Sequence, residues 1–340
     1  MIEKTKYSDS HREALDKVKK CFAPVSEDIR QLLKLIPSLL HSDSKSAQQI
    51  LVHVLSQPGK MLRSSVFLLL CRLLQYEGKH KLQIAAATEF VHNASLLHDD
   101  VVDSSTQRRN KPTAHTIWGD ESAVLVGDLI YARASELMAA TGKLAIVNAF
   151  ASAIRQMSEG ELLQLENIGN YSIEESTYFK IIRSKTAALM VAACQSAGYL
   201  KEVDDHQINE LQNFGLNIGL AFQLVDDALD MMGENIGKKN FTDLKQGKMT
   251  YPFLVLRSAA SSDETKRLQQ LVDTQSTHSF EDIHFVSTLA KKYEVSKKTL
   301  QKAYDFTELA TKNLNLLFPY ESLEKKRLLE LIEHMVYRSF

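Results

Sequence analysis

Cysteine, glycine and proline are all scarce in this 340-residue chain. Its three cysteines, Cys21, Cys71 and Cys194, stand far apart and outside any CxxC pair. That spacing argues against a disulfide framework or a zinc site and fits a reducing, cytoplasmic environment. Only 13 glycines and 6 prolines punctuate the whole length, too few for the many turns of a β-sandwich or a β-barrel. The chain is therefore predicted to be mostly helical.

Long apolar runs and targeting segments are missing as well. No apolar stretch reaches the roughly 18 residues of a membrane span, since even SSVFLLLCRLLQY is interrupted by Arg72. The amino end lacks the apolar centre of a signal peptide and carries acids that a mitochondrial presequence avoids. With a formal net charge of −1, nothing indicates a nucleic-acid partner. We expect a soluble cytoplasmic protein without a transmembrane segment.

What the chain does contain is apolar residues at helical spacing along nearly all of its length. No Gly-, Ser- or Pro-rich linker divides it, so residues 1–340 are predicted to form one all-α domain, although length alone would also allow two. The predicted helices cover residues 12–40, 46–56, 60–77, 81–103, 119–141, 143–167, 174–199, 205–232, 249–261, 263–274, 280–293, 296–315 and 321–337.

Two acidic segments of the same type stand out, LLHDDVVD at residues 96–103 and QLVDDALD at residues 223–230. On a helix, residues four apart share a face, so Asp99 points with Asp103, and Asp226 with Asp230. Carboxylates this close repel one another, and burial beside leucine and valine makes their charges more costly. Bound cations would relieve that cost. Carboxylate oxygens are hard ligands, which favours Mg²⁺ or Mn²⁺ shared with a polyphosphate.

The alternative interpretation of one acidic turn is a helix cap or a solvated face, and for a single copy the odds are close to even. Two copies favour metal binding, because a solvated face would not have apolar neighbours on both sides. Basic residues that suit phosphates accompany them. Arg108 and Arg109 follow the first segment directly, and guanidinium groups bind phosphate through two hydrogen bonds at once. Most Lys and Arg are simply solvated, but together with two acidic segments these fit a site for two diphosphates.

These segments occur in the order typical of one enzyme family, and the chain resembles the trans-polyprenyl diphosphate synthases, most closely the long-chain, octaprenyl diphosphate synthase-like members. The resemblance is strong over residues 58–252, the motif core, and weak outside it. It is carried by PGKMLR, VHNASLLHDDVVD, RRNKPT, AVLVGD, EGELLQL, KTAAL, GLAFQLVDDALD and DLKQGKMTYP. A single DDxxD is weak evidence, whereas the ordered set is specific.

The resemblance implies an isoprenoid synthase-type helical bundle around a deep central cavity, usually in a homodimer. It also implies a Mg²⁺-dependent reaction in which an allylic diphosphate, of farnesyl or geranyl type, ionises and isopentenyl diphosphate attacks the carbocation head to tail. A dimer agrees with the segment AAATEFVHNASLL, which has more apolar surface than one buried stripe requires.

The resemblance assigns roles to individual residues as well. The Mg²⁺ ligands would be Asp99, Asp103 and Asp226, assisted by Asp100, Asp227 and Asp230. The allylic diphosphate would be bound by Arg108, Lys185, Lys238 and Lys248, and isopentenyl diphosphate by Lys60, Arg63, His92 and Arg109. Thr186 and Gln223 would lie beside the reacting carbons. The loop around Lys238 departs from the family pattern, because Lys239 and Phe241 replace the usual Pro and Gly.

Product length is predicted from the helix that carries the first acidic segment. Ser95 and Ala94 precede Asp99 by four and five residues, about 6 to 7.5 Å deeper at 1.5 Å per residue. Short-chain members of the family usually place an aromatic ring at one of these positions. Two small residues would leave the tunnel open for a product of about C30 to C50, for a quinone side chain, and Phe at Ala94 should shorten it.

Three other functions stay open at this point. A class I terpene cyclase shares the first acidic segment but normally has an NSE- or DTE-type second motif instead of QLVDDALD. The dipeptide His98-Asp99 suggests an HD-type phosphohydrolase, although no further histidines are grouped as that site requires. A non-catalytic partner subunit of a heteromeric prenyltransferase would have no reason to retain two costly carboxylate clusters.

Overall fold

The computed structural model describes residues 20–56, 59, 61–109, 111–232, 241–273 and 278–337. Within them the protein is helical apart from one pair of two-residue strands, so the all-α prediction is confirmed. The α-helices are α2 (Ser26–Leu39), α3 (Lys45–Leu55), α4 (Leu62–Leu73), α5 (Lys81–Val102), α6 (Ala114–Trp118), α7 (Asp120–Ala139), α8 (Leu144–Glu166), α9 (Glu175–Ile182), α10 (Ala188–Lys201), α11 (Asp205–Met232), α12 (Thr242–Lys245), α13 (Tyr251–Ala259), α14 (Ser262–Asp273), α15 (Phe280–Lys292), α16 (Val295–Leu317) and α17 (Leu323–Tyr337).

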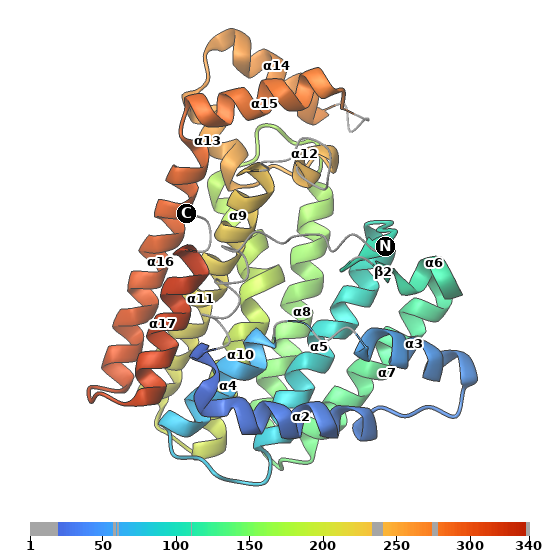
Figure 1. Cartoon of the computed structure of the whole chain (residues 1–340), viewed down its shortest axis with the longest axis vertical. Helices are drawn as coiled ribbons and strands as arrows, with labels where there is room; N and C mark the ends of the chain where they lie inside the picture. Colours follow the sequence, from blue (N-terminus) through green and yellow to red (C-terminus); the bar gives the residue numbers. More distant parts are fainter. Residues whose placement is uncertain are drawn as a thin grey trace, which may run out of the picture.

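The long helices run side by side along the long axis of the molecule (Figure 1). α10 is central among them, since it contacts α4, α5, α8 and α11. Its sequence suits that place, because small residues such as Ala192, Ala193, Ala197 and Gly198 are buried and let the neighbouring helices come close. α5 and α11, which carry the two acidic segments, both pack against α10. The central helix therefore fixes the two acidic helices relative to each other.

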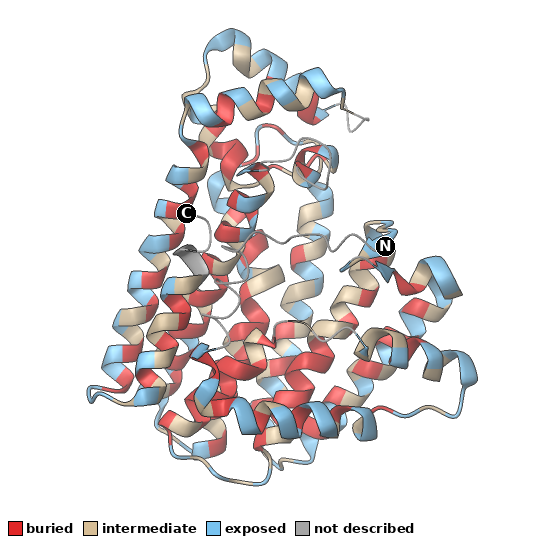
Figure 2. Ribbon diagram, in the orientation of Figure 1, coloured by how far each residue is buried: buried red, intermediate tan, exposed pale blue. Residues whose placement is uncertain are grey.

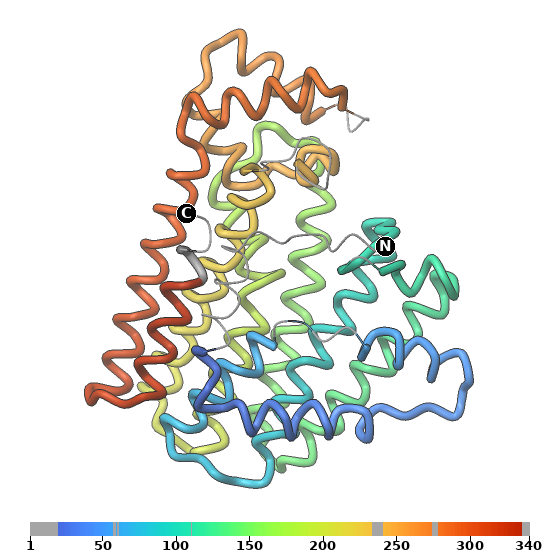
Figure 3. The backbone as a smooth tube through the Cα atoms, viewed as in Figure 1, coloured from blue at the N-terminus to red at the C-terminus, as the bar shows by residue number. Residues whose placement is uncertain are grey.

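Shorter helices close the ends and one side of this bundle (Figure 3). α2 crosses one end of the long helices, while α14 and α15 lie at the other end. An ion pair between Lys292 and Glu264, at 2.7 Å, joins α15 to α14. α16 packs along α11, and α17 packs along α16. α4, α5, α10 and α11 contribute the largest numbers of buried residues among the described helices.

The buried hydrophobic side chains form two clusters. Figure 2 marks the buried residues in red along the ribbon. One cluster joins α2, α4, α5, α7, α8 and α10, and the other joins α9, α13, α14, α15 and the C-terminal half of α11. The border between them falls at η2 (Arg183–Ala187), a π-helical turn between α9 and α10. Ala187 belongs to the second cluster and Ala188 to the first. The site described below lies at this level of the bundle.

The predicted helices match the structure closely in position, with four differences, one of which is that α12 (Thr242–Lys245) lies outside every predicted helix. The helix predicted over 174–199 is interrupted by η2. The segment predicted as irregular between 103 and 119 contains the antiparallel strands β1 (Gln107–Arg108) and β2 (Lys111–Pro112), followed by the short α6. Within 12–40, the described part begins at residue 20 and includes a 3₁₀ turn, η1 (Ala23–Val25). None of the described helices is long and apolar enough to cross a membrane. A single domain over residues 1–340 stays a prediction.

Candidate active site

The first acidic segment lies at the C-terminal end of α5, and its three carboxylates face different partners. Asp99 lines a cavity inside the bundle. Asp100 is buried, and its two carboxylate oxygens share the Nε–H of Arg108, at 2.8 and 3.0 Å. Asp103, which caps α5, lies 3.3 Å from Nζ of Lys248. The segment therefore points one carboxylate into the cavity and uses the others to hold basic residues at its rim.

The carboxyl group of Asp99 is in an environment that disfavours its charge. Burial raises its pKa to about 6, the positive charge of Lys185 lowers it, and the nearby carboxylates of Glu161 and Asp103 raise it further. A bound cation would remove this penalty, because an opposite charge favours the ionised form. The position of Asp99 is thus suited to a metal ion.

The second acidic segment lies on α11 and shows the same division. Asp226 lines the same cavity as Asp99. Asp227 is buried behind it, where burial raises its pKa to about 6. Asp230 accepts hydrogen bonds from the backbone amides of Thr242 and Asp243, at 3.0 and 3.1 Å. Asp230 thereby caps α12 and ties α11 to the segment that carries Lys248.

The shared cavity has a volume of about 510 Å³ and lies between α4, α5, α7, α8, η2, α10 and α11. One part of its wall is charged or polar and the rest is apolar. The charged and polar members include Arg63, His92, Asp99, Glu161, Lys185, Thr186, Gln223 and Asp226. The apolar members include Leu96, Val102, Met157, Leu162, Leu165, Leu189 and Phe222. A ligand with a charged head and an apolar tail matches this division.

Three predicted phosphate-binding residues each form an ion pair with a carboxylate, and one of these pairs lines the cavity. Arg108 pairs with Asp100 at 2.8 Å, and Lys248 pairs with Asp103 at 3.3 Å. Lys185 pairs with Glu161, a residue of α8 that also lines the cavity. These pairs fix the side chains in place before any phosphate arrives, which limits the entropy lost on binding.

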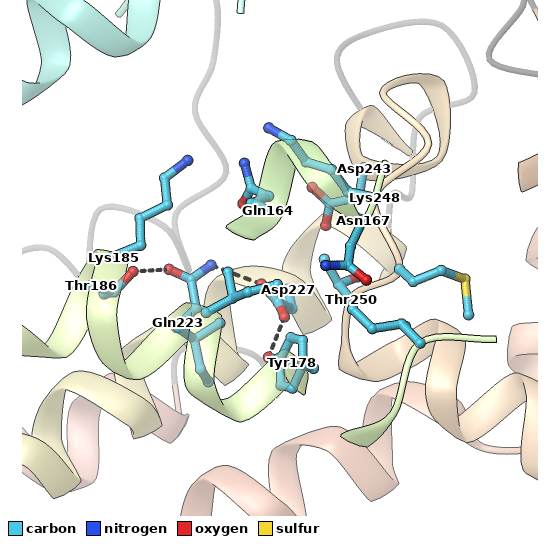
Figure 4. A pocket seen from close by; sticks show the side chains of 14 residues that line it. Gln164, Asn167, Tyr178, Lys185, Thr186, Gln223, Asp227, Asp243, Lys248 and Thr250 are labelled. Atoms are coloured by element: carbon cyan, nitrogen blue, oxygen red, sulfur yellow. Dashed lines mark hydrogen bonds between the residues drawn. The ribbon is translucent and has the colours of Figure 1, made fainter. Parts of the chain in front are cut away.

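Thr186 and Gln223 belong to a chain of hydrogen bonds beside the cavity (Figure 4). The hydroxyl of Thr186 donates to Oε1 of Gln223 at 2.7 Å, and Nε2 of Gln223 donates to Asp227 at 2.8 Å. The hydroxyl of Tyr178 donates to the other oxygen of Asp227 at 2.6 Å. Because the hydroxyl of Thr186 donates its hydrogen bond to Gln223, its oxygen lone pairs stay available toward the cavity.

The structure describes three of the four residues predicted to bind isopentenyl diphosphate. Arg63 and His92 line the cavity, and Arg109 lines a small adjoining pocket. Burial, together with the positive charges of Arg63, Arg109 and Arg108, holds the pKa of His92 well below its usual value, so the imidazole is neutral. Nε of Arg63 is buried without a hydrogen-bond partner among the described residues. Lys60 and Lys238 lie outside the described residues.

The two residues predicted to set product length lie differently. Ser95 lines the cavity, and its hydroxyl donates to the carbonyl of His92 at 2.8 Å. Ala94 has no exposed surface and belongs to the core. Their role in chain length stays a prediction, and the geometry favours Ser95.

A divalent cation fits the site if a ligand supplies part of its coordination shell. Asp99, Asp103 and Asp226 are the residues that would hold it. Within the residues that the structure describes, no three His, Cys, Asp or Glu side chains converge on one point closely enough to bind an ion by themselves. Mg²⁺ commonly takes one or two carboxylates together with water and substrate phosphates, so this donor set is compatible with Mg²⁺.

Two residues of the site were given no role from the sequence. Glu161 pairs with Lys185, and Tyr178 holds Asp227. A signal for Tyr178 was available, since it precedes Lys185 by seven residues and so falls on the same helix face. His98 also lines the cavity, and it packs as well, since Nε2 lies 3.0 Å from the carbonyl of Val124 and the ring fills the space beside Gly127.

Comparison with known proteins agrees with this geometry. The family model described as Polyprenyl synthetase matches residues 44–289. An octaprenyl diphosphate synthase of Escherichia coli strain K12 is 38% identical over 250 residues, which cover 73% of this chain and 77% of the relative. A crystal structure of a decaprenyl diphosphate synthase from Rhodobacter capsulatus superposes with a TM-score of 0.89 at 33% identity, covering 94% of this chain and 99% of that one.

A polyprenyl synthase from Caulobacter crescentus CB15, solved in complex with calcium and isoprenyl diphosphate, superposes with a TM-score of 0.87 at 33% identity. This match covers 95% of this chain and 97% of that one. The family match covers well over half of the chain and includes both acidic segments. The chain belongs to the polyprenyl synthetase family.

Proposed function

We propose that this protein is a long-chain polyprenyl diphosphate synthase, which condenses isopentenyl diphosphate head to tail with an allylic diphosphate into an all-trans chain, serving quinone side chains. The observation that carries the proposal is one cavity lined by Asp99, Asp226 and Lys185 together with an apolar wall. The names of the two relatives, octaprenyl and decaprenyl diphosphate synthase, support the long-chain class.

The allylic diphosphate would bind at the rim that Arg108, Lys185 and Lys248 form. Each of these cations already faces a carboxylate, so the bound diphosphate would share or replace those contacts. Bound Mg²⁺, held by the aspartates, would neutralise the charge that develops on the leaving diphosphate. Lys238 stays a predicted member of this set.

Isopentenyl diphosphate would bind on the side of the cavity lined by Arg63 and His92, with Arg109 and the predicted Lys60 nearby. The neutral imidazole of His92 would donate a hydrogen bond to phosphate without adding charge. The buried Nε–H of Arg63, which has no hydrogen-bond partner among the described residues, can donate a hydrogen bond to phosphate. Isopentenyl diphosphate would be held only through its phosphates, so its carbon chain could reach the allylic cation.

The carbocation formed on ionisation would lie beside Thr186 and Gln223. The lone pairs of Thr186 can stabilise positive charge, because its proton is engaged by Gln223 at 2.7 Å. The apolar part of the wall, which includes Leu96, Leu189 and Phe222, would exclude water that could otherwise trap the cation.

Incubation of the purified protein with Mg²⁺, farnesyl diphosphate and labelled isopentenyl diphosphate tests the proposal. We expect a long linear prenyl diphosphate, identified by mass spectrometry, and no product when a chelator is present. A cyclic hydrocarbon would favour a class I terpene cyclase, and released inorganic phosphate would favour a phosphohydrolase. No product under any metal condition would favour a non-catalytic partner subunit.

We further propose that the protein acts as a homodimer through α7 and α8. These neighbouring helices expose large apolar side chains outside the cavity wall, with Leu125 66% and Leu144 71% exposed. Large apolar side chains exposed on neighbouring helices are typical of protein interfaces. Residues 85–97, from which a dimer was predicted, are mostly buried by helices of the same chain and so do not carry the inference. The cytoplasmic location stays a prediction.

Leu125→Glu should weaken the dimer at least about tenfold, or about 1.4 kcal/mol, because it places a charge in an apolar interface. Sedimentation equilibrium at micromolar concentrations measures the dissociation constant. Leu316→Glu on α16 is the matched control, since Leu316 is similarly exposed at 56%. Dissociation caused by Leu316→Glu and not by Leu125→Glu would place the interface elsewhere.

A further inference from the structure

The π-helical turn η2 positions two of the residues on which the proposed function depends. Lys185 and Thr186 both lie in it, and both line the cavity. At its end, the backbone amide of Ala188 donates to the carbonyl of Arg183, five residues back, as in a π-helix. Such turns are rare and are often found at functional sites, because they redirect side chains relative to a regular helix.

Two glycines touch this turn from opposite helices. A methyl group at Gly160 of α8 would lie 2.8 Å from Cβ of Ser184 and 2.9 Å from the backbone nitrogen of Lys185. A methyl group at Gly219 of α11 would lie 2.5 Å from both Cα and Cβ of Ala187. Both distances are shorter than real carbon contacts. Since alanine is favoured over glycine by up to about 1 kcal/mol inside a helix, close approach is the physical reason for glycine at both places.

On its other sides the turn borders open space. Lys185 and Thr186 face the active-site cavity, while Arg183 and the adjoining Ala188 line a second cavity of about 380 Å³ between α8, α10 and α11. The turn also lies where the two core clusters meet. The turn is therefore incompletely packed where it borders the two cavities. It is closely packed against Gly160 and Gly219.

We propose that Gly160 and Gly219 are positioning residues, which clamp η2 between α8 and α11 and so hold Lys185 and Thr186 in place for the allylic substrate. This inference rests on the proposed function of the cavity. Gly160 is next to Glu161, which pairs with Lys185, and Gly219 is one turn before Gln223, which bonds Thr186. A shift of the turn would thus separate both pairs at once.

Gly160→Ala and Gly219→Ala test the clamp. A displacement of about 1 Å at reacting groups can lower the rate by about 100-fold, so we expect kcat to fall roughly 10- to 100-fold in each variant. The KM for farnesyl diphosphate should rise as Lys185 moves. The KM for isopentenyl diphosphate should stay unchanged, because Arg63, His92 and Arg109 lie on α4, α5 and the β1–β2 turn, away from η2.

Gly215→Ala is the matched control. Gly215 lies one turn from Gly219 on the same helix, and a methyl group there would lie 2.9 Å from Cα of Val191 and 3.0 Å from the carbonyl of Met190, both in the regular part of α10. It should destabilise the protein to a similar extent, measured by thermal unfolding, without the selective change in the KM for farnesyl diphosphate. The same kinetic change in Gly215→Ala would overturn the clamp.

Binding of a non-hydrolysable allylic diphosphate, farnesyl thiolodiphosphate, gives a second readout that does not depend on turnover. Calorimetry should show weaker binding to Gly160→Ala than to the wild type, and partial recovery in Gly160→Ala with Ser184→Gly, which removes the nearest carbon. This double variant also serves if Gly160→Ala alone does not fold. Unchanged affinity in folded Gly160→Ala and Gly219→Ala would refute the clamp, whereas an inactive wild type would refute the proposed function.

Discussion

Replacing Asp99 with Asn should nearly abolish chain elongation while making the ligand-free protein more stable. Asn cannot supply the charge that a divalent cation needs, so the charge on the leaving diphosphate would be poorly neutralised. Loss of such stabilisation lowers kcat by roughly 10³-fold, equivalent to about 4 kcal/mol in the barrier. The measurement is kcat with Mg²⁺ and both substrates at saturation. Retention of more than a tenth of wild-type kcat would remove Asp99 from the metal site.

The gain in stability follows from the direction of the pKa shift. Because burial raises the pKa of Asp99 from 3.8 to about 6, the folded protein binds this proton more tightly than the unfolded chain does. Its contribution is therefore complete below about pH 4 and is lost as the pH rises through 6. Both proteins are compared in the presence of a chelator. Between pH 4 and a pH above 6, the free energy of unfolding of the wild type should fall by about 1 to 3 kcal/mol relative to Asp99→Asn, and solvent screening places the value toward the lower end.

Denaturant unfolding at pH 4.5 and pH 7.5 measures this difference. Asp282→Asn on α15 is the informative comparison, because Asp282 accepts hydrogen bonds from the backbone amide and hydroxyl of Ser279 in a capping box, and these lower its pKa instead of raising it. That variant should be less stable than the wild type by about 1 kcal/mol, as expected for a weakened cap. An equal effect of both substitutions would mean that Asp99 carries no buried-charge penalty.

The acidic pairing could be predicted because its cause is local. Helical spacing places Asp99 and Asp103 on one face, and the apolar neighbours indicate an interior position. What each carboxylate contacts depends on segments far along the chain. Asp103 meets Lys248, 145 residues away, and Asp230 meets a helix that begins after a predicted loop. The sequence therefore predicts that the carboxylates cluster, but not which partner each of them contacts.

The turn η2 shows the opposite case. Residues 174–199 have uninterrupted helical periodicity and contain no proline, so nothing local predicts a break. The break coincides with the close approach of Gly160 and Gly219 from neighbouring helices. Gly160 precedes Lys185 by 25 residues, and Gly219 follows Ala187 by 32 residues. Tertiary contacts of this kind override local preference.

Ser95→Phe should shorten the main product by several isoprene units. Ser95 lines the cavity one turn deeper than Asp99, about 6 Å along α5. An aromatic ring there would fill the path of the growing tail, so elongation would stop once the chain reached it. Product length after exhaustive reaction is measured by mass spectrometry of the dephosphorylated alcohols. Ser95→Ala is the matched control, and it should keep the wild-type product because it adds no volume.

The same substitution at Ala94 separates a tunnel wall from a packed core. Ala94 is fully buried and belongs to the core cluster, so Phe there has to displace neighbouring side chains, at a cost of about 1 to 3 kcal/mol of stability or more. We expect Ala94→Phe to lower the unfolding temperature, and Ser95→Phe to change chain length with little loss of stability. The reverse pattern would mean that the tail passes on the Ala94 side of α5. An unchanged product in both variants would show that the tail grows along a different wall of the cavity.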